Sequence, residues 1–200
     1  MCGIAGIADL KKYPDNTELS AMLGQISHRG PDSIGLYMDK GLVMGMTRLS
    51  IIGIDDGDQP IFNENKMIAV ICNGEIYNYP ELKTDLISKG HRFYTSSDTE
   101  VLVHLYEEYG LKMVDYLNGM FAFAIWDKLN SRLLLFRDRI GIKPLYYTTF
   151  GGELIFASEI KAIMKHPKIK AKCAYQNLNE YIFYQFCIGE KTLFKDIKKV

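Results

Sequence analysis

The 200-residue sequence has no apolar run long enough to cross a membrane as a helix, which takes about 18 residues or more. Its first residues lack the basic start and apolar centre of a signal peptide. Lysine plus arginine and aspartate plus glutamate both number 24, so nothing in the charge balance favours nucleic acid or an anionic membrane. These absences indicate one ordinary globular domain, in which 48% hydrophobic residues can build a core.

Cysteine and histidine are both scarce. The cysteines show no CxxC pair and no density typical of a disulfide framework, which favours a reducing, cytoplasmic setting. The histidines are scattered without a pair at metal-ligand spacing, so we expect no metal. The cysteines are Cys2, Cys72, Cys173 and Cys187, and the histidines are His28, His91, His104 and His166.

Short apolar segments with strand-like spacing fill much of the chain. Tight turns join several of them into hairpins, and some are apolar throughout, as in strands covered on both faces. Because the helical blocks are separate and βαβ alternation is missing, we predict an α+β fold with antiparallel sheets stacked between helix layers. The predicted strands are 2–8, 34–38, 42–48, 61–62, 67–72, 92–94, 120–126, 132–136, 145–149 and 154–157, and the predicted helices are 17–26, 80–90, 97–109, 160–165 and 176–186.

Local signals mark the starts and faces of these helices. Thr17 is a plausible N-cap, and residues 97–100 (Ser-Asp-Thr-Glu) have the spacing of a capping box. In the helix that Pro80 opens, Leu82, Leu86 and Ile87 are predicted to face inward.

Cys2 is the residue with the most distinctive chemistry. A thiol needs a base to become nucleophilic, and an N-terminal cysteine carries one in its α-amino group, whose pKa is about 7.7–8. If Met1 is removed, Cys2 can therefore be an N-terminal nucleophile. The alternative is a buried structural cysteine, and the first residues alone leave both interpretations open.

Eight short motifs follow one another along the chain. They are Cys2–Gly6, His28–Asp32, Arg48–Ile51, Asn73–Asn78, Ser97–Glu100, Asn118–Ala122, Arg137–Tyr147 and Phe156–Lys161. In this order, and over essentially the whole chain, they closely resemble the N-terminal glutaminase domain of glutamine-hydrolysing asparagine synthetases. That domain is a class II, N-terminal nucleophile (Ntn-hydrolase) glutamine amidotransferase, so the resemblance implies a four-layer αββα sandwich of two antiparallel sheets.

The resemblance also implies catalytic roles. Cys2 would attack the side-chain amide of glutamine with help from its own amine, giving ammonia and a thioester that water hydrolyses to glutamate. Asn73 and Gly74 would form the oxyanion hole through a side-chain N–H and a backbone N–H. Gly74 also suits close approach of the backbone to substrate. Taken alone, Asn73-Gly74 is equally a plain turn sequence.

The charged head group of glutamine needs partners once it loses water. Arg48 is expected to bind its carboxylate bidentately, and Asp98, with help from Glu75, its ammonium. As isolated residues, Arg48 would suit a surface salt bridge and Asp98 a helix N-terminus. The arginines of 28–32 and 137–139 are expected to hold loops around the pocket. The backbone expected along the ligand is that of Arg48, Leu49, Ser50, Ile51 and Ile52.

The ammonia needs an acceptor that this chain does not activate. Amide synthesis in the resembled family uses ATP and Mg in a synthetase domain, and neither its Ser-Gly-Gly-x-Asp-Ser type of loop nor GxxxxGK[ST] occurs here. We therefore expect no cofactor in this chain. Residues 1–200 are expected to form a type-2 glutamine amidotransferase domain, with about 190–200 beginning the connector to a synthetase domain or subunit, and the natural gene to continue past Val200.

Alternative functions stay open at this point. Asparagine synthesis from aspartate is the leading interpretation, and L-glutamine the expected donor. The acceptor could instead be a sugar or another carboxylate, or the chain could be a non-catalytic module or a different N-terminal nucleophile amidase. The intact set of Cys2, Arg48, Asn73, Gly74 and Asp98 argues against a non-catalytic module, and the pair Arg48 and Asp98, suited to an amino-acid head group, argues against a different amidase. A homodimer is compatible with all of them.

Overall fold

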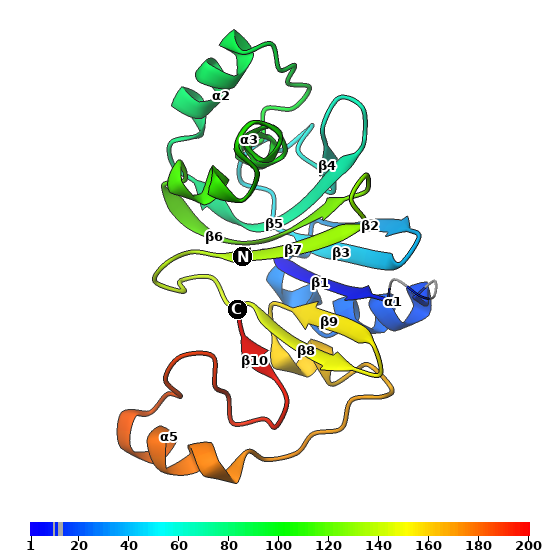
Figure 1. Cartoon of the computed structure of the whole chain (residues 1–200), viewed down its shortest axis with the longest axis vertical. Coiled ribbons are helices and arrows are strands. Elements are labelled where there is room, and N and C mark those ends of the chain that lie inside the picture. The colour runs from blue at the N-terminus through cyan, green and yellow to red at the C-terminus, as the bar shows by residue number, and fades with distance from the viewer. Residues whose placement is uncertain (10, 12–13) are drawn as a thin grey trace.

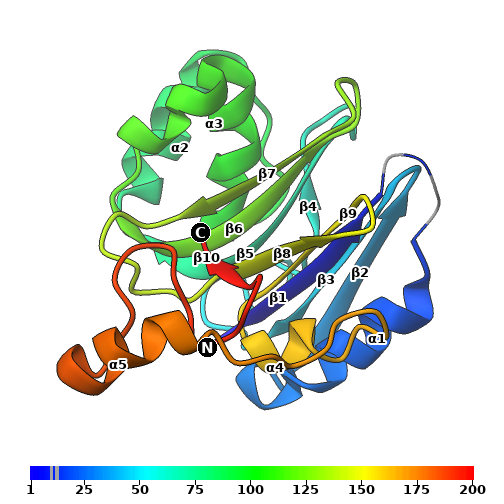
Figure 2. The same cartoon turned by 60° about the horizontal axis from the view of Figure 1, so that its bottom comes forward.

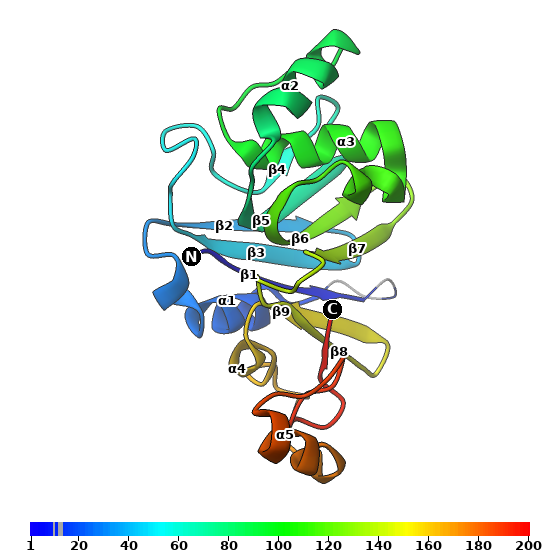
Figure 3. The same cartoon turned by 90° about the vertical axis from the view of Figure 1, so that its left-hand side faces the viewer.

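The computed structural model describes residues 1–9, 11 and 14–200 and consists of two antiparallel sheets stacked face to face (Figures 1 and 3). The six-stranded sheet contains, in spatial order, β10 (Lys198–Lys199), β8 (Tyr146–Phe150), β9 (Glu153–Ala157), β1 (Gly3–Ala8), β3 (Leu42–Arg48) and β2 (Ser33–Asp39). The four-stranded sheet contains β4 (Ile61–Phe62), β5 (Ile68–Ile76), β6 (Gly119–Asp127) and β7 (Arg132–Arg137).

Helices cover the outer face of each sheet. In Figure 3, α2 (Tyr79–Ser88) and α3 (Val101–Tyr109) lie over the four-stranded sheet, and α1 (Asn16–Gly24) and α4 (Ile160–Ile163) lie under the six-stranded one. The predicted αββα order is thus confirmed. A fifth helix, α5 (Leu178–Tyr184), stands at one end of the molecule (Figure 2) and buries none of its residues. No helix of the described chain is long and apolar enough to cross a membrane.

Three apolar layers fill the spaces between the two helix layers and the two sheets. The strands place alternate side chains in different layers, because successive residues of a strand point to opposite faces. On β5, Ala69 and Ile71 pack between the sheets, whereas Val70 and Cys72 pack under the helices α2 and α3. On β1, Ile4 faces the layer between the sheets and Ala5 the layer over α1 and α4.

This alternation directs the predicted catalytic residues. Continuing the odd-numbered series of β5 brings Asn73 to the face between the sheets. Continuing the even-numbered series of β1 backwards brings Cys2 to the same face, where it packs against the layer between the sheets. Cys2 and Asn73, the expected nucleophile and the expected oxyanion donor, therefore come from opposite sheets.

Several local predictions differ from the structure. Residues 92–94 form no strand, and Ile87 is 52% exposed because it lies on the solvent side of α2. Asp15, not Thr17, caps α1, since its carboxylate accepts the Thr17 N–H at 2.8 Å. Ser97 does cap the turn that leads into α3.

The second half of the expected capping box is wrong. The Glu100 carboxylate does not return to the Ser97 N–H but accepts the backbone N–H groups of Tyr94 and Thr95 at 2.9 and 2.7 Å. The Tyr94 N–H belongs to the segment that forms no strand and the Thr95 N–H follows it directly, so Glu100 supplies acceptors that a neighbouring strand would have provided.

Candidate active site

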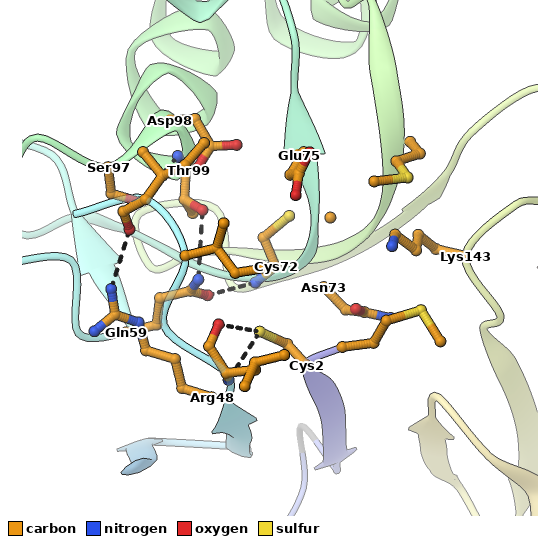
Figure 4. A pocket seen from close by; sticks show the side chains of 16 residues that line it. Cys2, Arg48, Gln59, Cys72, Asn73, Glu75, Ser97, Asp98, Thr99 and Lys143 are labelled. Atoms are coloured by element: carbon orange, nitrogen blue, oxygen red, sulfur yellow. Dashed lines mark hydrogen bonds between the residues drawn. The ribbon is translucent and has the colours of Figure 1, made fainter. Parts of the chain in front are cut away.

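A pocket lies where the ends of several strands meet at the seam between the sheets (Figure 4). Cys2 enters it from just before β1, Asn73, Gly74 and Glu75 from β5, and Asp98 from the turn before α3. The pocket is lined by Met1, Cys2, Arg48, Leu49, Ile51, Ile52, Gln59, Cys72, Asn73, Gly74, Glu75, Ser97, Asp98, Thr99, Met120 and Lys143.

The Cys2 side chain is half-buried, and its sulfur contacts the backbone of Leu49, the residue directly after β3. Its Sγ accepts the Leu49 N–H at 3.3 Å and lies 3.6 Å from the Leu49 carbonyl oxygen. The Cys2 backbone is fixed as well, because Arg29 Nε donates to its carbonyl oxygen at 2.8 Å. Arg29 is itself held by the Glu159 carboxylate at 2.9 Å. The expectation that Arg29 supports the pocket is met by a direct contact to the residue that carries the thiol.

Asn73 offers a hydrogen-bond donor that nothing in the described chain accepts. Its Nδ2 is buried and has no partner, although the residue is almost completely inaccessible to water. A buried donor without a partner costs about 1–3 kcal/mol, so such groups are rare in native structures. An unpaired amide N–H in the same pocket as a thiol is the arrangement expected of a donor that awaits a developing oxyanion.

The neighbouring strand leaves no room for a side chain at Gly74. A Cβ atom at this position would lie 2.4 Å from the Met120 carbonyl oxygen and 2.7 Å from the Phe121 Cα. These atoms belong to the neighbouring strand β6, which pairs with β5 at this point. The close approach that excludes a side chain is therefore to β6, while Gly74 still lines the pocket.

Asp98 is a buried carboxylate that lacks a cationic partner among the described residues. Its Oδ2 accepts the Ile76 N–H at 2.8 Å. Burial, together with the nearby charge of Glu75, raises the pKa of Asp98 above its usual value. Figure 4 shows both carboxylates on the same side of the pocket, which gives that side a negative charge suited to an ammonium group.

The Arg48 guanidinium is buried and already engaged. Its Nη1 pairs with the Asp58 carboxylate at 2.9 Å, and its Nη2 donates to the carbonyl oxygens of Ile52 and Gly53. These bonds fold the segment after β3 around the pocket. No bond from Nε to a described residue is seen.

The segment after β3 lines the pocket only in part. Leu49, Ile51 and Ile52 are lining residues. Ser50 is not, and its backbone N–H donates to the Asp32 carboxylate at 2.8 Å. This bond joins the motifs 28–32 and 48–51, which are separate in sequence.

Sequence patterns had not indicated Gln59 and Lys143 as pocket residues. Gln59 accepts the Cys72 N–H at 2.6 Å from a segment without a motif. Lys143 is buried at the end of a loop whose backbone N–H groups bind Asp138, and Arg137 donates to its carbonyl oxygen. The motif containing Lys143 was recognised, but only the folded loop brings its side chain to the pocket.

The sequence is similar to those of several known proteins. Relatives include asparagine synthetase [glutamine-hydrolyzing] 2 of Bacillus subtilis, 50% identical over 172 residues, which cover 84% of this chain and 23% of that protein. Asparagine synthetase [glutamine-hydrolyzing] 3 of the same organism is 40% identical, with 100% of this chain and 33% of that protein covered. The chain thus spans about a quarter to a third of the length of these relatives.

The fold also occurs in a solved structure of glutamine phosphoribosylpyrophosphate amidotransferase from B. subtilis. The match has a TM-score of 0.69 and 24% identity, and covers 81% of this chain and 43% of that one. The family model described as "Glutamine amidotransferase domain" matches residues 1–200. The chain belongs to the glutamine amidotransferase domain family.

Proposed function

We propose that this domain hydrolyses L-glutamine to glutamate and ammonia, with Cys2 as the nucleophile. The observation that carries the proposal is the meeting of the Cys2 thiol and the unpaired Asn73 amide in one pocket, beside the buried carboxylate of Asp98. A nucleophile, an oxyanion donor and an anionic binding group are the elements that amide hydrolysis of an amino-acid substrate requires.

In the first step the Cys2 sulfur attacks the carbon of the glutamine side-chain amide, and the thiol proton passes to a base. Asn73 Nδ2 and the Gly74 backbone N–H stabilise the oxyanion that forms. The tetrahedral adduct expels ammonia, whose nitrogen takes a proton from the base, and leaves a thioester. Water then attacks the thioester, releasing glutamate and restoring the thiol.

The base is the α-amino group of Cys2, exposed when Met1 is removed. Among the described residues that line the pocket none is a histidine, so a Cys–His pair is not at hand. The amine has a pKa near neutrality and is attached to the same residue as the sulfur. Met1 lines the same pocket, so its removal also clears space for substrate.

The head group of glutamine binds at the other side of the pocket. Asp98, with Glu75, receives the ammonium, and Arg48 receives the carboxylate together with the backbone of residues 49–52. Because the Nη atoms of Arg48 already hold Asp58 and backbone carbonyls, we expect Nε or an exchange with Asp58 to serve the carboxylate.

The ammonia then serves an ATP- and Mg-dependent synthetase domain or subunit, most simply one that makes asparagine from aspartate, as the names of the relatives suggest. On this view 1–200 is the amidotransferase domain and about 190–200 leads to the connector. Exposed apolar side chains around α5 support a contact there with such a partner. They are Tyr175, Ile182, Phe183 and Phe186.

Other acceptors, such as a sugar or a different carboxylate, would use the same glutaminase site. The four cysteines are free thiols, which supports a reducing, cytoplasmic setting. The proposal includes a homodimer whose interface does not cover the pocket.

Release of glutamate and ammonia from glutamine tests the proposal directly. The chain that starts at Cys2 should release both in equal amounts without ATP, and Cys2→Ser should abolish the reaction. Cys173→Ser is the matched control, since that thiol is exposed and outside the pocket. Undiminished activity of Cys2→Ser, or an inactive Cys2-initiated chain that still binds glutamine, would contradict the proposed nucleophile.

A further inference from the structure

Two histidines and two glutamates converge outside the pocket, under the helix layer of the four-stranded sheet. Glu64 lies in the turn between β4 and β5, and His91 follows α2. His104 and Glu107 lie one turn apart on α3. One ligand atom from each of the four residues lies within 4.8 Å of the others. Three segments that are distant in sequence thus meet at one point.

Both imidazoles turn Nδ1 toward the two carboxylates. His104 Nδ1 lies 3.3 Å from Glu107 Oε2 and 3.6 Å from Glu64 Oε2. His91 Nδ1 lies 3.7 Å from Glu64 Oε1 and 3.7 Å from Glu107 Oε2. Four ligands bound tetrahedrally at about 2.0–2.1 Å stand roughly 3.3–3.4 Å apart. The nitrogen–oxygen separations exceed this spacing by up to a few tenths of an ångström, and the widest pair in the set, at up to 4.8 Å, would have to close further on metal binding.

The outer nitrogen of each imidazole faces another carboxylate. His91 Nε2 lies 3.0 Å from Glu108 Oε1, and His104 Nε2, which has no hydrogen-bond partner in the described chain, lies 3.7 Å from Glu100 Oε1. A histidine that binds a metal through one nitrogen commonly presents its other N–H to a carboxylate, which fixes the ring. The cluster contains this arrangement as a hydrogen bond at His91, and at His104 with the carboxylate at ion-pair distance.

The two glutamates of the cluster are themselves held in place. Asn63 Nδ2 donates to Glu107 Oε1 at 2.7 Å, and the Arg92 backbone N–H donates to Glu64 Oε1 at 2.8 Å. His104 is fully buried and the His91 side chain nearly so. Side chains with so little freedom lose little conformational entropy when they bind an ion.

We propose that Glu64, His91, His104 and Glu107 form a structural site for a divalent transition metal, best suited to zinc. Two imidazoles favour zinc over magnesium or calcium, and four protein ligands leave no open position for a catalytic water. The two carboxylates neutralise the ion. The metal joins the turn after β4, the segment after α2 and the helix α3, and so stabilises the helix layer.

Protons compete with a metal ion for the imidazole nitrogens of His91 and His104. Glu100, Glu107 and Glu64 surround His104, and although burial alone opposes the charge, these carboxylates raise the pKa of His104 to about 9. His91 faces Glu64, Glu107 and Glu108. An ion-pair network without metal is therefore the outcome against which zinc binding has to be measured.

Zinc titration of the chelator-treated chain decides between the two. The background is Cys2→Ser, because the pocket thiols Cys2 and Cys72 can also bind zinc. We expect one zinc per chain, measured against a chromophoric competitor, and a higher melting temperature with zinc. His91→Gln and Glu107→Gln should weaken binding by at least about tenfold, whereas His28→Gln, an exposed histidine elsewhere, should leave it unchanged.

Two results would overturn the site. One is the absence of zinc binding and of any zinc-dependent rise in melting temperature in the Cys2→Ser chain. The other is equal zinc affinity in the background and in both cluster variants, with circular dichroism showing that the variants are folded. Co²⁺ in place of zinc gives an independent readout, because four-coordinate cobalt has a strong visible absorption that should vanish in His91→Gln. None of these measurements depends on glutaminase activity.

Discussion

Replacing Asp98 by asparagine should stabilise the ligand-free domain and at the same time weaken glutamine binding. The Asp98 residue is only 5% exposed, and burial with the nearby Glu75 raises the pKa of its carboxyl group. Folding therefore places an uncompensated charge in a poorly hydrated site. Asparagine has the same shape and keeps an oxygen that can accept the Ile76 N–H, but it carries no charge.

The effect on stability has a definite pH dependence. Because the pKa of Asp98 is raised above the unfolded value of 3.8, its contribution to stability is fully present below that value and is lost as the pH rises through the folded pKa. As the pH rises from 3.8 through the folded pKa of Asp98, the stability of Asp98→Asn relative to the parent chain should therefore increase, and it should level off at higher pH.

Asp138 provides the matched contrast, since it is also buried, at 7% exposure. Burial alone would raise the pKa of Asp138, but the N–H groups of Lys143 and Ile142 outweigh it, and the pKa is lowered. Its contribution is present above the unfolded value of 3.8 and is lost as the pH falls through the folded pKa. Asp138→Asn should therefore destabilise the domain at neutral pH.

Glutamine binding should change in the opposite direction to stability. Without Asp98 the ligand ammonium is buried unpaired, which costs about 2–5 kcal/mol, or roughly 30- to 4000-fold in affinity. Cys2 and Asn73 act at the other end of the substrate. Most of the loss should therefore appear in the dissociation constant rather than in the chemical step.

Urea unfolding in a Cys2→Ser background measures both effects without turnover. Glutamine should raise the unfolding midpoint of Cys2→Ser and have little effect on the double variant with Asp98→Asn. The double variant should be the more stable of the two without glutamine at neutral pH. Lower stability there would mean that Asp98 is a structural carboxylate, and unchanged glutamine binding would refute its role toward the ammonium.

The remaining predictions concern the reacting end of the pocket. Asn73→Ala should lower kcat by about 10²–10³-fold with a small change in KM, and an unchanged kcat would exclude it as the oxyanion donor. Arg29→Met should lower kcat by about tenfold or more because the Cys2 carbonyl loses its anchor. Lys161→Met, which removes another partner of Glu159 but touches no part of Cys2, should leave kcat intact; equal losses in both would point to a general effect. A chain with an uncleaved N-terminal tag should be inactive and gain activity when cleaved before Cys2, and full activity with the tag in place would exclude the amine as the base.

Strands and their hairpins were predictable because alternation and turn residues act locally. The hairpins β2–β3 and β8–β9 occur where they were predicted. The strand β5 is longer than predicted, through Ile76, because its polar end lines the pocket instead of the core. Residues 92–94 have strand-forming side chains but no neighbouring strand, and the N–H groups of Arg92 and Tyr94 donate instead to the carboxylates of Glu64 and Glu100.

The site was predictable where motifs mark it and unpredictable where tertiary contacts create it. Cys2, Asn73 and Asp98 do line one pocket, and their chemical roles stay predictions. Gln59 reaches the pocket through a bond to the Cys72 backbone that no local pattern encodes. The proposed metal site has no sequence signal for the same reason, because its histidines have no ligand-like spacing in sequence and meet only when α3 packs beside the segment after α2.

Cys2 and Asn73 are attached to different sheets, so the gap between their side chains depends on the packing of the whole sandwich. Its width depends on how closely the sheets stack, and small residues such as Ala122 and Ala124 occupy the layer between them. A larger side chain there would push the sheets apart at a cost of about 1–3 kcal/mol in stability, and a misplacement of about 1 Å can slow a reaction about 10²-fold, a loss of similar size in free energy. Because Ala122 is the cross-strand partner of Asn73, a larger side chain at this position should impair the reacting geometry as well as the packing of the sheets.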